Sequence, residues 1–462
     1  MPHRLVALSF LLVALSAGQK ASSADASKAY DLTSAAKQGD VVHVVASMTV
    51  GGELLAADDE AKETKLPMSV VADLDYDERL LDWSPYAEKP ARSLRHYRTA
   101  KATLKTEEIG VDRELAKEDR LLVVDVAADG SSAVNGLEQT LTRDEFDLVN
   151  VIGNTLLLER LLPGRSLKES DGWDHDAATI GALVGMDNVS VCEVRSVVTG
   201  MENRQVQIRL AGVVHGTVDG AASEMDLRGA YLFHLDDGRI SKFNMAIKES
   251  RKPGEVSPGL DVVAKLSLVI TPLSAIDQAD AFDAADVAAA RALEPSQLRK
   301  LRVESPSRGY RFMHDKAWFV TAEQREAMSL RLMAAGELLG HCNVSTLPAR
   351  PAGKPMTLQQ FEQNVVKSLG DNAGEVKAAT EWANAAGHQC LGVIVAGTVD
   401  EVPMLWRYYF IADEGKRPTT VAVTVEQSAE ERFSDADRSI VDSIVLLDAP
   451  AGTAAKPGAL KK

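Results

Sequence analysis

The sequence predicts an α+β fold built mainly from antiparallel strands. Long runs of alternating apolar and polar residues dominate the chain up to residue 272, and Asp-Gly pairs join some of them. Asp-Gly between alternating runs is a strong hairpin signal, and successive hairpins form an antiparallel meander. The rest of the chain combines shorter strand patterns with two helical patterns, which is typical of an α+β unit with an antiparallel sheet.

The N-terminal segment has the order of a secretory signal peptide. Arg4 precedes an apolar run from Leu5 to Leu15, and small residues follow it. That run is shorter than the roughly 20 residues that a membrane-spanning helix needs, and no later run is longer. We favour cleavage after Ala24 over cleavage after Gly18. No cysteine follows the run as a lipid anchor, so we expect a soluble exported protein, periplasmic or extracellular, with no membrane span.

The composition of the chain limits the classes of partner that it can bind. The formal net charge of −16 disfavours binding to nucleic acid or anionic membrane surfaces as a bulk property. A chain of 462 residues is long enough for more than one domain. The expected plan runs in order through six parts: signal peptide 1–24, flexible lead-in 25–40, curled antiparallel-sheet domain 41–272, acidic Ala-rich linker 273–304, second domain 305–448 and disordered tail 449–462.

The first domain is predicted as a long meander with one or two helices. Thr142 and Glu145 form an S/T-x-x-E capping box that opens a helix, and Pro163-Gly164 closes it. A second helix is expected from near Asp174 to Gly185. The predicted strands cover 41–50, 67–75, 120–126, 189–199, 205–215, 223–235, 240–248 and 260–271. Strands this long should twist and curl, with the helices on the inner face.

The second domain is predicted to hold an antiparallel sheet and two helices. A capping box at Thr357 and Gln360 opens one helix, which ends near Gly370. A last helix is expected over 435–445. The predicted strands cover 309–312, 328–334, 338–347, 376–382, 388–396, 403–411 and 419–426.

Several short sequence segments of this second domain resemble the PsbP/Mog1-like α/β/α family. They are Gly309-Tyr310-Arg311-Phe312, then Trp318, then Trp406-Arg407-Tyr408-Tyr409-Phe410, and finally the terminal Phe433, Asp437 and Ile440-Val441. The resemblance implies an α/β/α sandwich that serves as a binding or assembly module and carries no catalytic motif.

The first domain resembles uncharacterised exported bacterial proteins. The likeness rests on the arrangement from Arg95-His96-Tyr97 to Leu161-Leu162-Pro163-Gly164. In architecture alone, the long meander with helices is similar to the half-barrel of lipoprotein carriers. That likeness implies a carrier with an apolar cavity, whereas a helix filling the inner face would leave no room for a ligand.

The segment Asp171 to Asp176, which includes His175, is the strongest candidate for metal binding. Carboxylates and an imidazole this close could ligate a divalent cation. The spacing matches neither an EF-hand loop nor H-E-x-x-H, and Asp at a helix start has an ordinary capping role. We therefore expect no metal site and no cofactor.

His314 followed by Asp315 is the strongest candidate for acid/base chemistry, because a carboxylate can orient an imidazole. No serine or cysteine stands in a recognisable nucleophile turn such as G-x-S-x-G. An enzyme would need His175 or His314 in a cleft with convergent carboxylates. We expect no catalytic residues.

The remaining candidates concern cysteines, strand histidines and aromatic side chains. Cys342 and Cys390 could form a disulfide in an exported protein, or could be two buried thiols on nearby strands. His215 and His234 are expected to be ordinary sheet residues. On the strand at 403–411, aromatic side chains on both faces indicate a central strand of a covered sheet.

The sequence thus favours a non-catalytic protein-binding or assembly factor with an unknown partner and unknown binding residues. The alternative is an extracytoplasmic carrier that holds a lipid or another apolar ligand in the first domain.

Overall fold

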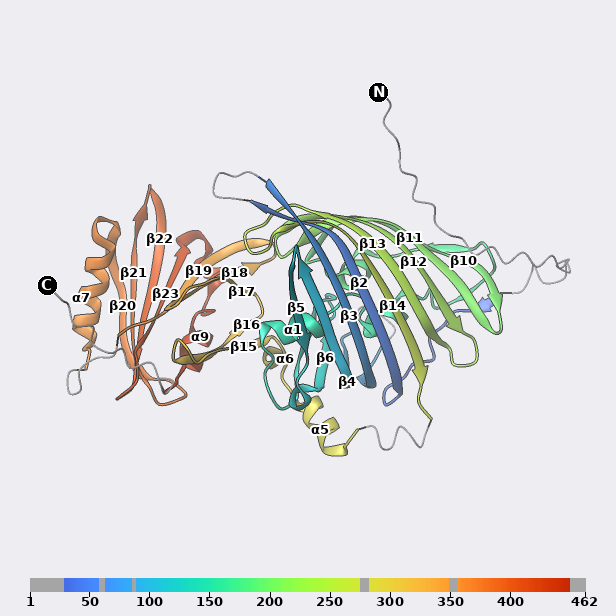
Figure 1. The fold of residues 1–462 in the computed structure, drawn as a ribbon, viewed down its shortest axis with the longest axis horizontal. Coiled ribbons are helices and arrows are strands. Elements are labelled where there is room, and N and C mark those ends of the chain that lie inside the picture. Colours follow the sequence, from blue (N-terminus) through green and yellow to red (C-terminus); the bar gives the residue numbers. More distant parts are fainter. Residues whose placement is uncertain (1–28, 58–62, 85–88, 275–281, 349–354, 449–462) are drawn as a thin grey trace, which may run out of the picture.

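The computed structural model describes residues 29–57, 63–84, 89–274, 282–348 and 355–448. These residues form two large antiparallel sheets that lie side by side, each with its own apolar core (Figure 1). The predicted β-rich, antiparallel character of the chain is confirmed. The expected signal peptide and C-terminal tail lie outside the described residues.

The first sheet contains 12 strands within the described residues. Its order is β7-β6-β4-β3-β2-β14-β13-β12-β11-β10-β9, and β5 pairs with β4. The strands are β2 (Val41–Ala57), β3 (Glu63–Asp82), β4 (Ala91–Thr106), β5 (Ile109–Glu114), β6 (Leu121–Val126), β7 (Ser132–Gly136), β9 (Gly172–Asp174), β10 (Asn188–Glu202), β11 (Gln205–Val218), β12 (Ala221–His234), β13 (Arg239–Arg251) and β14 (Gly259–Pro272). The meander from β10 to β14 was predicted, and β2 then joins β14 to extend the sheet.

Helices fill the inner side of this sheet. They are α1 (Arg143–Val149), α2 (Thr155–Leu158) with the 3₁₀ turn η2 (Glu159–Leu161), and α3 (Ala177–Val184). Apolar side chains from the helices and from alternate positions of the strands form one core. Leu156, Leu157, Leu158 and Ile180 are fully buried in it. The concave side is therefore packed with protein.

Local sequence explains where these helices begin and end. Thr142 and Glu145 make the predicted capping box of α1. The expected single helix is interrupted, because α1 ends at Val149 and Asn154 caps a separate α2 by accepting a hydrogen bond from the amide of Leu156. Helix α3 begins after Asp176 and ends at Gly185, which adopts the left-handed conformation (φ 78°) that favours glycine.

A buried polar network ties α2 to β3 and β4. The carboxylate of Glu78 accepts hydrogen bonds from Arg95 Nε (2.7 Å), Ser93 Oγ (2.7 Å) and Thr155 Oγ1 (2.6 Å). Arg95 also donates to Asn154 Oδ1 (2.6 Å) and lies 5.0 Å from the centre of the Tyr76 ring. Because Arg95 and Glu78 compensate each other's charge, the core can hold both.

Residues 29–40 depart from the expected flexible lead-in. The short strand β1 (Tyr30–Asp31) pairs with β8 (Ser166–Leu167), and Leu32 is fully buried in the first core. Burial of the apolar side chains in this segment offsets the entropy lost when the segment becomes ordered. The sequence did not indicate this order because the neighbouring residues are small and polar.

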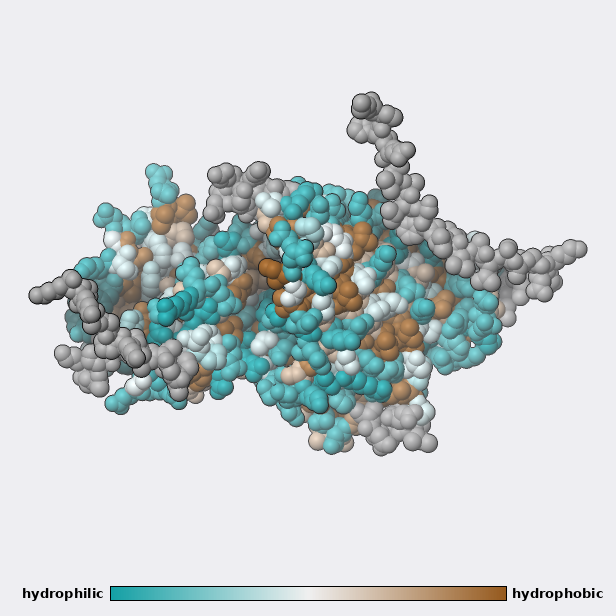
Figure 2. Space-filling model, viewed as in Figure 1, coloured by the Kyte–Doolittle hydropathy of each residue, from teal (hydrophilic) through white to brown (hydrophobic). Residues whose placement is uncertain are grey.

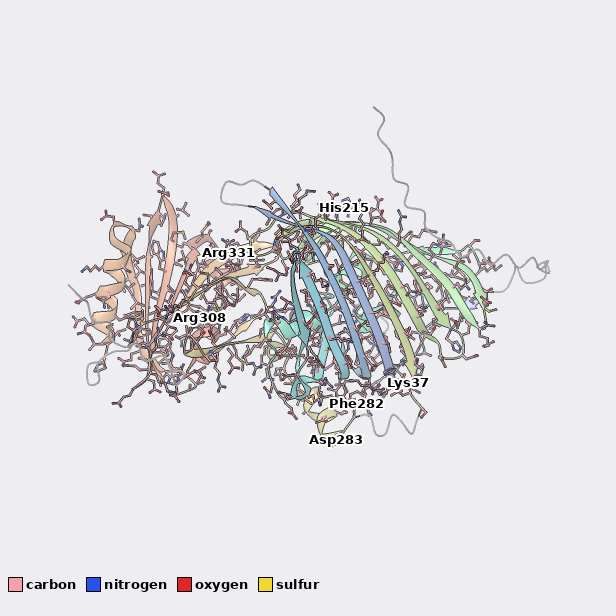
Figure 3. The ribbon with its side chains drawn as sticks, in the orientation of Figure 1. Lys37, His215, Phe282, Asp283, Arg308 and Arg331 are labelled. Carbon is pink, nitrogen blue, oxygen red and sulfur yellow. The ribbon has the colours of Figure 1, made fainter. Side chains whose placement is uncertain are left out.

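The predicted linker is also packed in its described part. It contains α5 (Ala284–Ala292) and α6 (Pro295–Leu298), which lie against the end of the first sheet. Phe282, just before α5, is buried beside β2 and β4 residues in a small second cluster (Figure 3). Arg92 of β4 donates to the backbone oxygens at the end of α5, including that of Leu293 (2.8 Å). These contacts fix the segment to the sheet instead of leaving a free tether.

The second sheet has seven strands in the order β17-β18-β19-β23-β22-β21-β20 within the described residues. A separate three-stranded sheet has the order β15-β16-β24. The strands are β15 (Lys300–Ser305), β16 (Tyr310–Asp315), β17 (Trp318–Glu323), β18 (Ala327–Ala334), β19 (Glu337–Thr346), β20 (Ala373–Ala383), β21 (Gln389–Val399), β22 (Val402–Ala412), β23 (Thr419–Glu426) and β24 (Val445–Leu446).

Each face of the second sheet carries a different layer. Helix α7 (Leu358–Leu369) opens at the predicted Thr357 capping box and packs Phe361 and Val365 against β21 and β22. On the other face, α8 (Glu430–Phe433), α9 (Arg438–Ser443) and the three-stranded sheet enclose a separate core around Trp318 and Phe433. Strand β22 is apolar on both faces because it lies between these two layers.

The first sheet and its helix α1 contact the second sheet and the three-stranded sheet at several points. Asn135 of β7 donates to the backbone oxygen of Lys300 (2.8 Å), and Arg331 of β18 forms an ion pair with Glu255 of the β13–β14 loop (2.8 Å; Figure 3). Arg143 of α1 lies 4.6 Å from the centre of the Phe319 ring.

The longest described helix, α7, has 12 residues, and no described helix combines the length and apolarity of a membrane span.

Candidate binding surface

The outer face of the first sheet is the candidate binding surface. Strands alternate their side chains between faces, so Leu210, Met245 and Leu266 point into the filled core while their neighbours point out. Strand register aligns these outward neighbours across five strands. One row consists of Ala211, Arg228, Ala246, Lys265 and Thr49, and the adjacent row consists of Arg209, Ala230, Asn244, Ser267 and Ser47.

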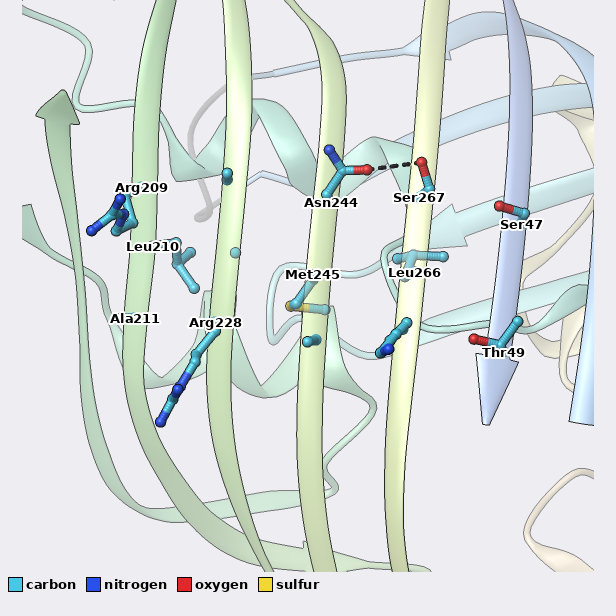
Figure 4. Close-up of a pocket in the computed structure, with 14 residues that line it drawn as sticks. Ser47, Thr49, Arg209, Leu210, Ala211, Arg228, Asn244, Met245, Leu266 and Ser267 are labelled. Atoms are coloured by element: carbon cyan, nitrogen blue, oxygen red, sulfur yellow. Dashed lines mark hydrogen bonds between the residues drawn. The ribbon is translucent and has the colours of Figure 1, made fainter. Parts of the chain in front are cut away.

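The two rows line a shallow groove of about 940 Å³ on this face (Figure 4). The groove is recessed because short alanine side chains alternate with longer or polar side chains along each row. Arg209 and Arg228 lie on β11 and β12 at one end of the groove (Figure 4). Lys265 lies on β14, nearer the other end. The face in view in Figure 2 is a mosaic of hydrophilic and hydrophobic residues. The groove is therefore set into a mixed surface.

The groove is positively charged although the whole chain is acidic. Its lining includes Arg209, Arg228 and Lys265 and no Asp or Glu. Within the described residues, Arg209 and Lys265 have no ion-pair partner, whereas Arg228 Nε forms an ion pair with the Asp226 carboxylate (3.5 Å). Arg209 and Lys265 are therefore available to an anionic ligand, and Arg228 can contact one by sharing its guanidinium with Asp226.

Uncharged donors stand beside the cations. Ser267 Oγ donates to Asn244 Oδ1 (2.8 Å), which holds the Asn244 amide in place and leaves its Nδ2 group as a donor (Figure 4). Ser47 and Thr49 add two hydroxyl groups from β2. The groove therefore combines cations with donors suited to carbonyl or carboxylate oxygens.

The side chains of the candidate metal-binding segment, Asp171 to Asp176, interact with separate partners and do not converge on one point. Asp174 pairs with Arg195 (3.0 Å), and Asp176 caps α3 through the Thr179 amide (2.7 Å). No cluster of three or more His, Cys, Asp or Glu ligands occurs among the described residues. The carboxylates of this segment have the capping and pairing roles that their place at a helix start suggests.

His175 points toward the sheet. Its Nε2 lies 2.7 Å from Ser196 Oγ, and Tyr231 donates to the same oxygen (3.0 Å). Burial lowers the pKa of His175 to about 4, so the imidazole is neutral at pH 7 and its Nε2 accepts a hydrogen bond from the Ser196 hydroxyl. Ser196 is fully buried, so its hydroxyl is not open to a substrate.

His314 is buried on β16 and is not in a cleft. Its Nδ1 contacts the backbone oxygen of Asp315 (2.8 Å), and the Asp315 carboxylate pairs instead with Arg299 (3.0 Å). Burial lowers the pKa of His314. The two side chains expected to form an acid/base pair thus interact with different partners.

Cys342 and Cys390 are free and buried, so of the two alternatives left open by the sequence the structure has the two buried thiols and not the disulfide. They lie on β19 and β21, which are separated by β23 and β22. Three strand spacings amount to roughly 14 Å, whereas a disulfide needs Cα atoms within about 7 Å. The strand patterns predicted that both cysteines lie on strands of one domain. They gave no measure of how many strands lie between the two. Cys192 is also free.

The other histidines and aromatic side chains have ordinary sheet environments. His234 pairs with Asp237 (2.8 Å), and His215 lies on β11 (Figure 3). Phe410 packs against Phe361 of α7, while Tyr409 faces the opposite core. The aromatic strand is thus covered on both sides, as expected.

Comparison with known proteins gives weak structural likeness only. No protein-family profile and no curated protein matches the sequence. The cyanobacterial PsbP of a Synechocystis strain is similar over 34% of this chain and 95% of its own, at 13% identity and a TM-score of 0.26.

The Ran-binding protein Mog1p of Saccharomyces cerevisiae is similar over 32% of this chain and 96% of its own, at 10% identity and a TM-score of 0.25. Lipovitellin is similar over 52% of this chain and 25% of its own, at 10% identity and a TM-score of 0.29. Likenesses at this level say nothing about what the chain binds.

Sequence reasoning did not find the groove residues. Each strand contributes only two or three of them, and strand register alone brings them together. One signal was present: the outward positions of β12 and β13 alternate alanine with a polar or basic residue, as in Arg228 with Ala230 and Asn244 with Ala246. Small residues at outward positions of a strand indicate space for a ligand.

Proposed function

We propose that the chain is an exported, soluble, non-catalytic binding protein that recognises its partner on the outer face of the first sheet. The observation that carries this proposal is the basic groove across β11, β12, β13, β14 and β2, with basic side chains above a floor of small side chains. Sites for specific partners combine such a recessed surface with a few fixed polar groups.

The filled inner side of the first sheet favours surface recognition over the carrier alternative. Helices α1 to α3 occupy the concave side with fully buried leucine and isoleucine side chains. A carrier of a lipid or another apolar ligand would have to displace them, which would expose apolar surface to water.

We also propose that the chain divides into two units at the segment that carries α5 and α6. In this proposal the second unit is a PsbP/Mog1-like α/β/α sandwich with an assembly role. The support is its layer arrangement, with α7 on one face of the sheet and α8 and α9 on the other.

The test is capture of a partner from the native exported fraction. Tyrosine at both Ala211 and Ala230 would fill the groove without changing its charge. Capture by the Ala211→Tyr, Ala230→Tyr variant should be lost, while Ala222→Tyr, an exposed alanine at the other end of β12, should leave capture intact. Equal capture by the double variant and the wild type would overturn the proposal.

A further inference from the structure

We infer that the partner of this groove is an acidic polypeptide segment in polyproline II conformation, with a carboxylate at every third residue. The inference rests on the proposed function, because it names the chemistry of the partner at the same surface. It is argued from the spacing of the cations, the uncharged donors and the charge contrast with the rest of the chain.

The spacing of two cations matches the repeat of a polyproline II helix. Arg228 and Lys265 stand in one register row on either side of Ala246, which places them two strands apart. Two strand spacings are roughly 9.5 Å. A polyproline II helix has three residues per turn and rises about 3.1 Å per residue, so its same-face side chains repeat every roughly 9.3 Å. A segment lying across the strands can therefore present successive carboxylates to Arg228 and Lys265.

A fully extended strand fits the same pair of cations less well. Its same-face side chains repeat at roughly 6.6 Å, which is well short of two strand spacings. Its residues three apart point to opposite faces, so only one of two such carboxylates could face the groove. Of these two conformations, polyproline II is the one in which carboxylates three residues apart both face the groove.

The uncharged donors suit the backbone of such a segment. A polyproline II helix has no internal hydrogen bonds, so its carbonyl oxygens need external donors. Asn244 Nδ2 and the hydroxyl groups of Ser47 and Thr49 stand beside the cations in the same two rows. The alanines of the floor allow the backbone to approach the sheet closely. Arg209, one strand from Arg228 and in the adjacent row, adds a third cation beside the carboxylate at Arg228.

Charge contrast gives the groove its selectivity. The chain as a whole carries a formal charge of −16, so it repels an acidic segment over most of its surface. The lining of the groove has the opposite sign, with three cations and no acidic residue. An acidic partner should therefore bind here with a marked dependence on ionic strength.

The probe is a synthetic peptide of Glu-Pro-Pro repeats, because proline holds the polyproline II conformation and glutamate recurs at every third residue. We expect saturable binding to the wild-type chain by fluorescence anisotropy, weakened by added salt. A Lys-Pro-Pro peptide should not bind, and a Glu-Pro peptide of equal charge should bind more weakly. Absence of Glu-Pro-Pro binding, or equal binding of the Lys-Pro-Pro peptide, would overturn the inference.

Matched variants locate the site. Replacing Arg209, Arg228 and Lys265 together with Gln should weaken Glu-Pro-Pro binding by up to about fivefold per side chain, or about 100-fold in total. The control replaces three exposed lysines outside the groove, Lys168, Lys252 and Lys367, with Gln and makes the same change in net charge. Equal weakening by both sets would show a bulk charge effect and overturn the inference.

Two further results separate this inference from the function on which it rests. If the charge variant retains the native partner while the Ala211→Tyr, Ala230→Tyr variant loses it, the surface binds a partner that is not acidic, and only this inference fails. If an acidic glycan such as heparin displaces the Glu-Pro-Pro peptide and binds more tightly to the same three side chains, the polypeptide assignment is wrong.

Discussion

Replacing Glu78 with Gln should destabilise the first sheet by about 3–5 kcal/mol, the range for breaking a buried ion pair by removal of one charge. Glu78 and Arg95 have exposed fractions of 1% and 5%, so water cannot compensate the guanidinium that the substitution leaves behind. Burial lowers the pKa of Arg95, but its charged and tyrosine neighbours raise that pKa overall, so Arg95 stays protonated. The lost partner is also the acceptor for Ser93 and Thr155.

Urea unfolding at pH 7, followed by far-UV circular dichroism, measures this effect as a lower midpoint with an unchanged slope. Replacing both partners, Glu78→Leu with Arg95→Met, should cost less than the single change because no buried charge is left unpaired. Glu53→Gln, which breaks the exposed Glu53–Lys65 pair, should cost less than about 1 kcal/mol. The reasoning is refuted if Glu78→Gln costs no more than Glu53→Gln, or if the double variant loses as much as the single one.

Three other substitutions or treatments test separate features. The pKa of His175 is about 4 when folded and 6.5 when unfolded, so the unfolded state takes up a proton first as pH falls. Its contribution is fully present above pH 6.5 and is lost toward pH 4, by up to about 3 kcal/mol; urea midpoints should fall over this range in the wild type and less in His175→Gln. Gly52→Ala should destabilise by more than about 1 kcal/mol, because φ is +153° and a Cβ would lie 2.2 Å from the Asp261 oxygen, whereas Gly51→Ala meets nothing within 4 Å. Faster amide exchange in β14 in the Gly52 variant alone would confirm this, and equal exchange in both variants would contradict it. Finally, Cys342 and Cys390 should resist a thiol reagent in the native state, and all three cysteines should react after unfolding without reductant; a single reactive thiol would mean that a bridge exists.

Signals that act over a few residues predicted much of the fold. The capping boxes at Thr142 and Thr357 open helices in the structure, and Gly185 ends α3 as expected. Asp219-Gly220 lies at the turn between β11 and β12. These features depend on backbone groups only a few residues apart, so the sequence contains all the relevant partners.

Strand β4 shows why other elements were missed. Its buried positions include Ser93 and Arg95, which belong to the Glu78 network, so the expected apolar alternation is hidden. The polar pattern could be recognised as a strand only with knowledge of Glu78 and Thr155, which lie 17 and 60 residues from Arg95. The groove has the same limit, because its residues come together through the register of five strands.

The ends of the two sheets have a consequence for the behaviour of the protein at high concentration. Strand β9 has only three residues and covers only the middle of the 15-residue β10, so much of β10 is an unpaired edge as far as the described segments of the chain show. Its pairing with β11 shifts register near both ends, and the edge strands β17 and β20 of the second sheet also carry shifts. Such bulges twist an edge away from the flat geometry that another strand needs for hydrogen bonding. The chain can therefore hold long exposed strands without templating edge-to-edge polymers of itself.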